Sequence, residues 1–200
     1  MTEKYIVTIG RQMGSGGREI GKKLANLLNI SYFDKEIINL ASKKSGLNEE
    51  FFEQMDEKNS FSFFDNFAGM QFSKNYLGSE TLFEIQSSII QELADKDSVL
   101  FVGRCADYIL REYPRRLDIF ITATKEDRIK RTAERKNISL KEAEDLNHMI
   151  DKRRKEYYNF FNKKSWGQAN SYHLCINSSI LGIDKSVDLI KIFIEQKFNL

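Results

Sequence analysis

Three glycines stand within four residues near the start of the chain, in the run Gly14-Ser15-Gly16-Gly17. An apolar, β-branched segment precedes this run, and a segment with apolar residues at helical spacing follows it. A glycine-rich turn between a strand and a helix directs backbone N–H groups and the positive end of the helix at one point. Such a turn binds anions, most often phosphate. A tight turn without a ligand is the alternative, but it would not need three glycines.

The glycine run is similar to a Walker A loop but lacks its lysine. The standard pattern has one glycine, four residues and then Gly-Lys-Ser/Thr. With Gly16 as the second glycine, Arg11 replaces the first glycine, Gly17 the lysine and Arg18 the hydroxyl residue. Arg18 could supply the missing positive charge. Glu19 could bind Mg²⁺ or stabilise the start of the helix.

Arginine is concentrated in the second half of the chain. Nine of the eleven arginines fall between positions 104 and 154, and residues 128–164 hold twelve Lys and Arg against six Asp and Glu. A guanidinium is a planar fork that matches phosphate. The candidates are Arg128, Arg131 and Arg135, which share one helix face, and a second cluster formed by Asp151, Arg153, Arg154, Tyr157 and Tyr158. Each arginine alone could instead pair within its helix, but we expect at least two of the set to contact phosphate.

Composition and charge exclude several classes of protein. The chain has 200 residues, of which 41% are hydrophobic and 30% charged, as in an ordinary folded domain. The net charge of +2 is too low for a bulk polycation, so we expect no nucleic-acid partner. No apolar run approaches the roughly 18 residues of a membrane span. Two cysteines and the lack of a signal-peptide pattern predict a cytoplasmic protein.

Five short apolar segments alternate with helical ones, which predicts a parallel sheet with helices on both faces. We expect strands at residues 5–9, 30–33, 98–102, 117–121 and 172–176, the last with Cys175 in the core. Helices are expected at residues 20–28, 82–93, 125–136, 140–161 and 187–198, and Asp34 could cap a further helix. Ligands of such sheets bind beyond the carboxyl ends of the strands. The glycine run and Gly103-Arg104 both lie there.

Residues 47–80 have a different character. Seven phenylalanines lie between positions 51 and 72, mixed with Asp, Asn, Ser and Gly and without clean periodicity. This is too much apolar surface for a solvated loop. We expect either an insert that folds over a ligand site and moves when the ligand binds, or the contact of a symmetric homodimer. The dimer is slightly favoured, because an open aromatic flap would aggregate.

The segment IGRQMGSGGREIGKKLANLLNISYFDKEII resembles the opening of the cytidylate kinase-like proteins, a branch of the P-loop nucleoside monophosphate (NMP) kinases. The similarity continues through FVGRCADYIL, RLDIFITA, RRKEYYNFF and INSSILGIDKSVDLI, and so covers nearly the whole chain. It implies an α/β fold, with one P-loop kinase-like domain over residues 1–200 and a five-stranded parallel sheet. It also implies an NMP-binding helical insert at residues 35–95 and an arginine-bearing helical lid at residues 125–168.

The resemblance implies roles for individual residues. Backbone N–H groups of Gly14, Ser15, Gly16 and Gly17 would bind the β-phosphate of ATP, with Arg18 and Glu19 beside them and Glu19 near Mg²⁺. Arg18, Arg131, Arg135 and Arg153 would be catalytic. Asp34, Lys35, Arg104, Asp151 and Arg154 would bind the acceptor. In true cytidylate kinases the match to Arg104 is followed by an aspartate, and here Cys105 takes that position.

The implied activity is ATP- and Mg²⁺-dependent phosphoryl transfer to a nucleoside monophosphate, with CMP or dCMP favoured by the resemblance alone. Two departures keep other functions open. The absent Walker lysine and the absent aspartate after Arg104 would suit a nucleotide-binding protein with little or no transfer. The Phe-rich stretch need not form a pyrimidine pocket, so a kinase of another small acceptor is a third candidate. In each case the expected partners are small-molecule nucleotides.

Overall fold

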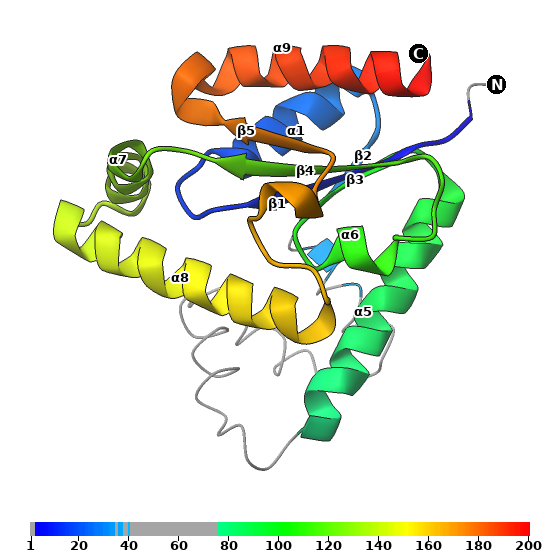
Figure 1. Ribbon diagram of the computed structural model, residues 1–200, viewed down its shortest axis with the longest axis horizontal. Helices are drawn as coiled ribbons and strands as arrows, with labels where there is room; N and C mark the ends of the chain where they lie inside the picture. The colour runs from blue at the N-terminus through cyan, green and yellow to red at the C-terminus, as the bar shows by residue number, and fades with distance from the viewer. Residues whose placement is uncertain (1–2, 35, 38–39, 41–75) are drawn as a thin grey trace.

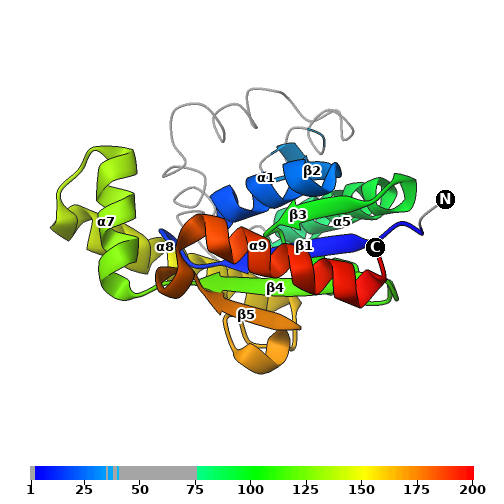
Figure 2. The ribbon, with the colours of Figure 1, turned by 90° about the horizontal axis from the view of Figure 1, so that it is seen from above.

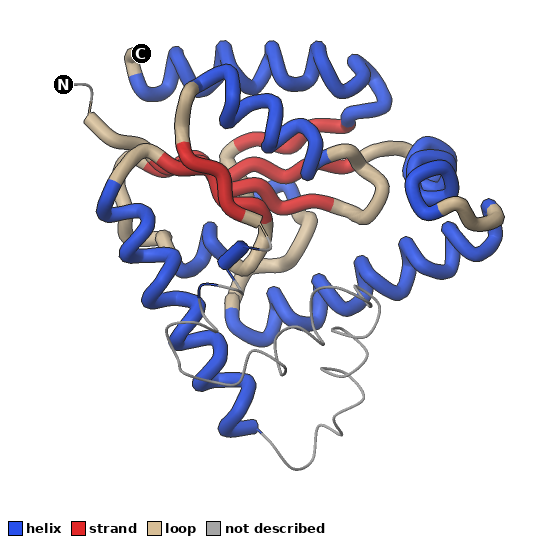
Figure 3. Tube along the Cα trace, turned by 180° about the vertical axis from the view of Figure 1, so that it is seen from behind, coloured by secondary structure: helices blue, strands red, loops and turns tan. Residues whose placement is uncertain are grey.

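The computed structural model describes residues 3–34, 36–37, 40 and 76–200. A five-stranded parallel sheet lies between two layers of helices (Figure 1, Figure 3). Its strands are β1 (Ile6–Arg11), β2 (Ser31–Phe33), β3 (Val99–Val102), β4 (Arg116–Thr122) and β5 (Leu174–Asn177), in the spatial order β2-β3-β1-β4-β5. All neighbouring strands pair in parallel. The predicted sheet is confirmed.

Helices cover both faces of the sheet. On one face lie α1 (Gly17–Leu28) and α9 (Ser178–Phe198), and on the other lie α5 (Tyr76–Lys96), α6 (Ala106–Ile109) and α8 (Leu140–Phe161). The helix α7 (Lys125–Lys136) stands beside the carboxyl ends of the strands, as Figure 2 shows from above. A short 3₁₀ helix, Ala169–Ser171, precedes β5. The carboxyl edge of the sheet is therefore framed by α1, α7 and α8.

The two faces of the sheet differ in polarity. Val7 and Ile9 belong to the apolar core beneath α1 and α9, while Ile6 belongs to the core beneath α5 and α6. Alternate residues of a strand face opposite sides, so Thr8 shares the face of Ile6. On that face the Thr8 hydroxyl donates to Asp118 Oδ1 at 2.8 Å. The buried polar groups of the sheet thus lie on the side of α6 and α8.

Two expectations about this framework are wrong. Cys175 is exposed rather than in the core, because β5 is an edge strand and one of its faces is left uncovered. The last helix begins at Ser178 instead of residue 187, with a kink at Gly182, whose φ is 75° and ψ 178°. Most of the helix expected after Asp34, as well as residues 51–72, lies outside the described residues. No helix in the described part is long and apolar enough to cross a membrane.

Candidate phosphate-binding and transfer site

The glycine loop connects β1 to α1 and has a shape that only glycine allows at two positions. Gly14 and Gly16 have φ values of 76° and 79°, in the left-handed region. A Cβ at Gly14 would lie 2.3 Å from the carbonyl oxygen of Arg128. The buried hydroxyl of Ser15 donates to a loop carbonyl at 2.9 Å and accepts from the N–H of Gly17 at 3.3 Å. Ser15 therefore uses its side chain inside the loop.

The loop opens onto a cavity of about 1130 Å³. A typical small-molecule pocket has roughly 300–1,000 Å³, so this cavity has room for more than one small ligand. Ten of the residues predicted for the site line it: Gly14, Gly16, Gly17, Arg18, Glu19, Asp34, Arg104, Arg131, Arg135 and Arg154. Of the others, Ser15, Arg128, Asp151 and Arg153 are not among the lining residues, and Lys35 lies outside the described part of the chain.

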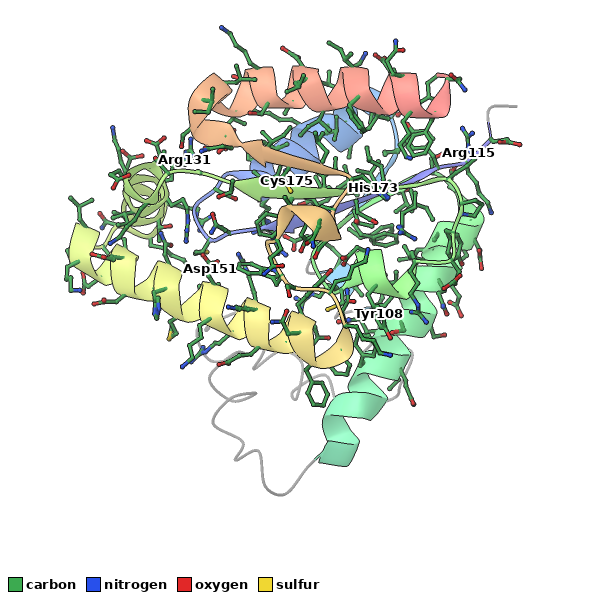
Figure 4. The ribbon with its side chains drawn as sticks, in the orientation of Figure 1. Tyr108, Arg115, Arg131, Asp151, His173 and Cys175 are labelled. Carbon is green, nitrogen blue, oxygen red and sulfur yellow. The ribbon has the colours of Figure 1, made fainter. Side chains whose placement is uncertain are left out.

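Arginines of α7 and α8 bind the backbone of the glycine loop. The bonds run from Arg154 to the carbonyl of Arg11 at 3.0 Å, from Arg128 to that of Met13 at 2.8 Å and from Arg131 to that of Gly14 at 3.4 Å. Figure 4 shows Arg131 on α7 and Asp151 on the side of α8 that faces the sheet. Three guanidinium groups from α7 and α8 thus hold three carbonyls of the loop.

Asp151 completes this link between α7, α8 and the loop. One oxygen of its carboxylate accepts from the N–H of Met13 at 2.7 Å, and the other accepts from the guanidinium of Arg128. Arg154 lies 3.6 Å away. Burial raises the pKa of Asp151, and the attraction of Arg154 and Arg128 offsets this only in part. The geometry gives Asp151 a bond to the loop, and its role in acceptor binding stays a prediction.

Asp34 follows β2 and is a buried carboxylate between two arginines. Arg18 Nε lies 2.7 Å from one of its oxygens, and Arg11 Nη2 lies 3.3 Å from the other. Burial acts to lower the pKa of Arg18, but Asp34 and Tyr32 outweigh it, so the pKa is raised. The side chain of Arg18 is half exposed and lines the cavity. Arg18 therefore lies at the junction of the glycine loop and the predicted acceptor site.

For the other arginines of the cavity, burial and neighbouring positive charges disfavour the charged form. Burial and the nearby charge of Arg18 lower the pKa of Arg135. Burial lowers the pKa of Arg104, and burial together with the charge of Arg11 lowers that of Arg154 to about 9. An anion bound among these groups would relieve both their mutual repulsion and their desolvation. The electrostatics of the cavity therefore favour a negatively charged ligand.

Some lining residues were not identified from the sequence as site residues. Arg11 packs against Gly103 so closely that a Cβ there would lie 1.9 Å from Arg11 Nη1. The signal for Arg11 was its place at the first Walker glycine. Asp107 also lines the cavity, two positions after Cys105, and so brings an acid near the position at which the resemblance led us to expect an aspartate after Arg104. Trp166 and Tyr172 line it from the segment between α8 and β5.

Together, the strand order, the glycine loop at the end of the central strand and the arginine-bearing helices over that loop define a P-loop kinase-like protein. Two solved shikimate kinases have this fold. The enzyme from Acinetobacter baumannii, in complex with shikimate, is 16% identical with a TM-score of 0.55, over 98% of this chain and 95% of the other. The enzyme from Bacteroides thetaiotaomicron is 15% identical with a TM-score of 0.55, over 96% and 98%. Such identities establish the fold alone.

The chain belongs to the cytidylate kinase-like family, whose model matches residues 6–180. An uncharacterized protein from Eubacterium ventriosum ATCC 27560 has a crystal structure with a TM-score of 0.75 and 29% identity, over 96% of this chain and 99% of the other. No protein of curated function matches the sequence. Family and fold together support a kinase of a nucleotide or another small molecule and leave the substrate undetermined.

Proposed function

We propose that the protein transfers the γ-phosphoryl group of ATP to a nucleoside monophosphate, with CMP or dCMP as the preferred acceptor. The observation that carries the proposal is the convergence of the glycine loop and the lid-type arginines on one cavity of about 1130 Å³. The family match supports the nucleotide as substrate. The phosphate of the acceptor and the three phosphates of the donor are anions, and the positive side chains around the cavity would attract them.

Phosphoryl transfer spreads negative charge over the moving group, so catalysis consists mainly of positioning and charge stabilisation. An oxygen of the acceptor phosphate attacks the γ-phosphorus, the bond to the β–γ bridging oxygen breaks, and ADP leaves. Backbone N–H groups of the loop would hold the β-phosphate. Arg18 and Arg135 both line the cavity, the charge of Arg18 disfavours that of Arg135, and the two would share the charge of the transferred group. No covalent intermediate on the protein is needed.

Mg²⁺ would enter with ATP. Among the described residues no group of three or more His, Cys, Asp or Glu could hold a metal ion. Mg²⁺ often binds through one carboxylate and the phosphates of its substrate. Glu19 fits this mode, because it stands in the first turn of α1, lines the cavity and is largely exposed beside Lys23, 3.1 Å away. The ion would neutralise phosphate charge, and Glu19 would orient it.

The variant Arg18→Ala tests whether Arg18 replaces the Walker lysine. A hydrogen bond to a charged group contributes roughly 1.5–3 kcal/mol, so ATP affinity or turnover should fall about 10- to 100-fold. Arg111→Ala, an exposed arginine in an ion pair with Glu112, is the matched control and should change neither quantity. Unchanged kinetic constants in Arg18→Ala would assign the charge to another residue, with Arg131 the next candidate.

The alternative is a nucleotide-binding protein with little or no transfer. It is favoured by the missing lysine and by the bonds that Arg128, Arg131 and Arg154 already make to loop carbonyls. A screen of purified protein with ATP, Mg²⁺ and each nucleoside monophosphate decides between them. ATP binding without any phosphorylated product supports the alternative. Adding shikimate and other hydroxylated small molecules to the screen tests the third candidate, a kinase of a different acceptor.

Small-molecule nucleotides are the partners that this function requires, and it needs neither nucleic acid nor a membrane. A cytoplasmic location stays a prediction. The homodimer expected through residues 51–72 also stays a prediction, because this stretch lies outside the described residues. Light scattering at tens of micromolar protein would test it, and a clean monomer would contradict it.

A further inference from the structure

Four carboxylates lie at the cavity or beside it, of which Asp34 and Asp118 are buried and Asp107 and Asp151 are part-buried. Three of the four have arginine partners. Asp34 pairs with Arg11 and Arg18, Asp118 with Arg116, and Asp151 with Arg128 and Arg154. The fourth, Asp107, forms no ion pair with any residue of the described ranges. A neutral phenol is its side-chain hydrogen-bond donor there, with Tyr158 Oη donating to Asp107 Oδ2 at 2.6 Å. Its negative charge is therefore not balanced by the described part of the chain.

The surroundings of Asp107 are aromatic. Asp107 stands in α6 and lines the cavity together with Tyr157, Tyr158, Trp166 and Tyr172. Phe120 of β4 supports this wall, with its ring centroid 5.2 Å from that of Trp166 and 4.9 Å from that of Tyr172. Aromatic side chains bind flat rings by offset stacking or edge contacts. One part of the cavity thus combines a surface for a flat ring with a hydrogen-bond acceptor.

We propose that this part of the cavity holds the ring of the acceptor, and that Asp107 accepts a hydrogen bond from an amino or hydroxyl group on the edge of that ring. An ionised carboxylate can only accept, so a ring that presents an N–H or O–H donor binds better than one that presents a carbonyl. Tyr158 is a positioning residue that orients the carboxylate. The inference rests on the proposed function and adds the group by which the acceptor is selected.

A purely structural role would not need a charge at position 107. Burial raises the pKa of Asp107 from 3.8 to about 6, the bond from Tyr158 and two backbone N–H groups lower it in part, and the charge of Asp118 raises it further. The neighbouring groups Cys105 and Tyr172 are neutral at pH 7, since the ordinary pKa of each is above 7 and burial raises it further. The ionised form is therefore held at a cost in stability. Perturbed carboxylates of this kind are concentrated at functional sites.

The raised pKa of Asp107 fixes the direction in which the stability of the protein changes with pH. Because the folded protein binds the proton of Asp107 more tightly than the unfolded chain does, stability falls as the pH rises from about 4 through about 6. Asp107→Asn has almost the same size and no charge. We expect this variant to have a higher melting temperature than the wild type at pH 8 and no advantage at pH 4. Asp188→Asn, on an exposed position of α9, is the charge-matched control and should show neither change.

Binding of matched nucleosides tests the proposal itself. Cytidine and pyrimidin-2-one riboside differ by the exocyclic amino group alone, as do adenosine and purine riboside. The deamino member of each pair has no N–H on its ring, and none of the four carries a titrating phosphate. The wild type should bind the amino member of at least one pair more tightly at pH 8. Asp107→Asn should weaken binding of that member about tenfold, the difference between a charged and a neutral hydrogen bond, and leave binding of its deamino partner nearly unchanged. At pH 5 the wild type should approach the variant.

The outcomes separate this inference from the proposed function. No preference for an amino-bearing ring, or the same affinity in Asp107→Asn and the wild type, would overturn the inference. If CMP is phosphorylated and Asp107→Asn keeps the wild-type kcat/KM, the proposed function stands and the ring subsite is refuted. If Asp107 selects the ring but no phosphate is transferred, the subsite stands and the proposed function is refuted.

Discussion

Replacing Asp151 with asparagine should destabilise the protein and loosen the glycine loop. The Asp151 side chain is 13% exposed, and its partners Arg128 and Arg154 are 14% and 18% exposed. Asparagine can still accept from the N–H of Met13, but it leaves two part-buried guanidinium groups without their counter-charge. Breaking a buried ion pair in this way costs about 3–5 kcal/mol. We expect the lower value, about 3 kcal/mol, because burial also raises the pKa of Asp151 and the variant relieves that desolvation.

Urea unfolding at pH 7, followed by circular dichroism, measures this loss. The matched control is Asp145→Asn on the same helix, whose ion pair with Lys141 is 67% and 75% exposed and should contribute less than about 1 kcal/mol. A double-mutant cycle that adds Arg128→Gln and the double variant isolates the interaction between Asp151 and Arg128. We expect a coupling free energy of about 1 kcal/mol or more. If Asp151→Asn loses no more than the control does, the proposed link between α8 and the loop is refuted.

Two further predictions use matched residues within the chain. Gly14 and Gly182 both have left-handed φ values, but an added Cβ meets a backbone oxygen at 2.3 Å in Gly14→Ala and nothing within 4 Å in Gly182→Ala. Thermal unfolding should show a loss of about 1 kcal/mol for Gly182→Ala and clearly more for Gly14→Ala, and equal losses would contradict this. In thiol labelling followed by mass spectrometry, exposed Cys175 should react quickly. Cys105, which is buried and has a raised pKa, should react only after unfolding.

The framework of the fold could be predicted because the local signals agree with each other. Each strand is a short apolar run, and each charged helix of the second half carries a clear period and a cap. Ser139, for example, forms a complete capping box with Glu142 at the start of α8. The start of α9 was missed because Gly182 interrupts the pattern, and the chain continues through a kink there. Cys175 was misplaced because a sequence does not say which strand is at the edge.

The candidate site also has one part that the sequence predicts and another that it does not. The glycine loop and the clustered arginines are visible as residue types at given spacings. Which atoms they contact depends on how α7 and α8 pack on the loop, and this packing brings together residues more than a hundred positions apart. Asp107 is near the missing acid of the motif in sequence, but only the turn from β3 into α6 directs it into the cavity. No local pattern carries that information.

Because the Walker lysine is missing, the positive charge beside the glycine loop has to come from side chains at other positions. A lysine in the loop would bring its charge with the backbone that binds phosphate. Here the charge proposed for Arg18 would be joined by that of Arg131, which lies on α7 and donates to the carbonyl of Gly14 and to the hydroxyl of Ser178. A guanidinium has five N–H donors, so these bonds leave others for a phosphate. The position of the Arg131 guanidinium therefore depends on how α7 packs on the loop. Substitutions at Gly14, in the loop, and at Asp151, on α8, should therefore weaken the same property, ATP affinity, although neither side chain would contact ATP.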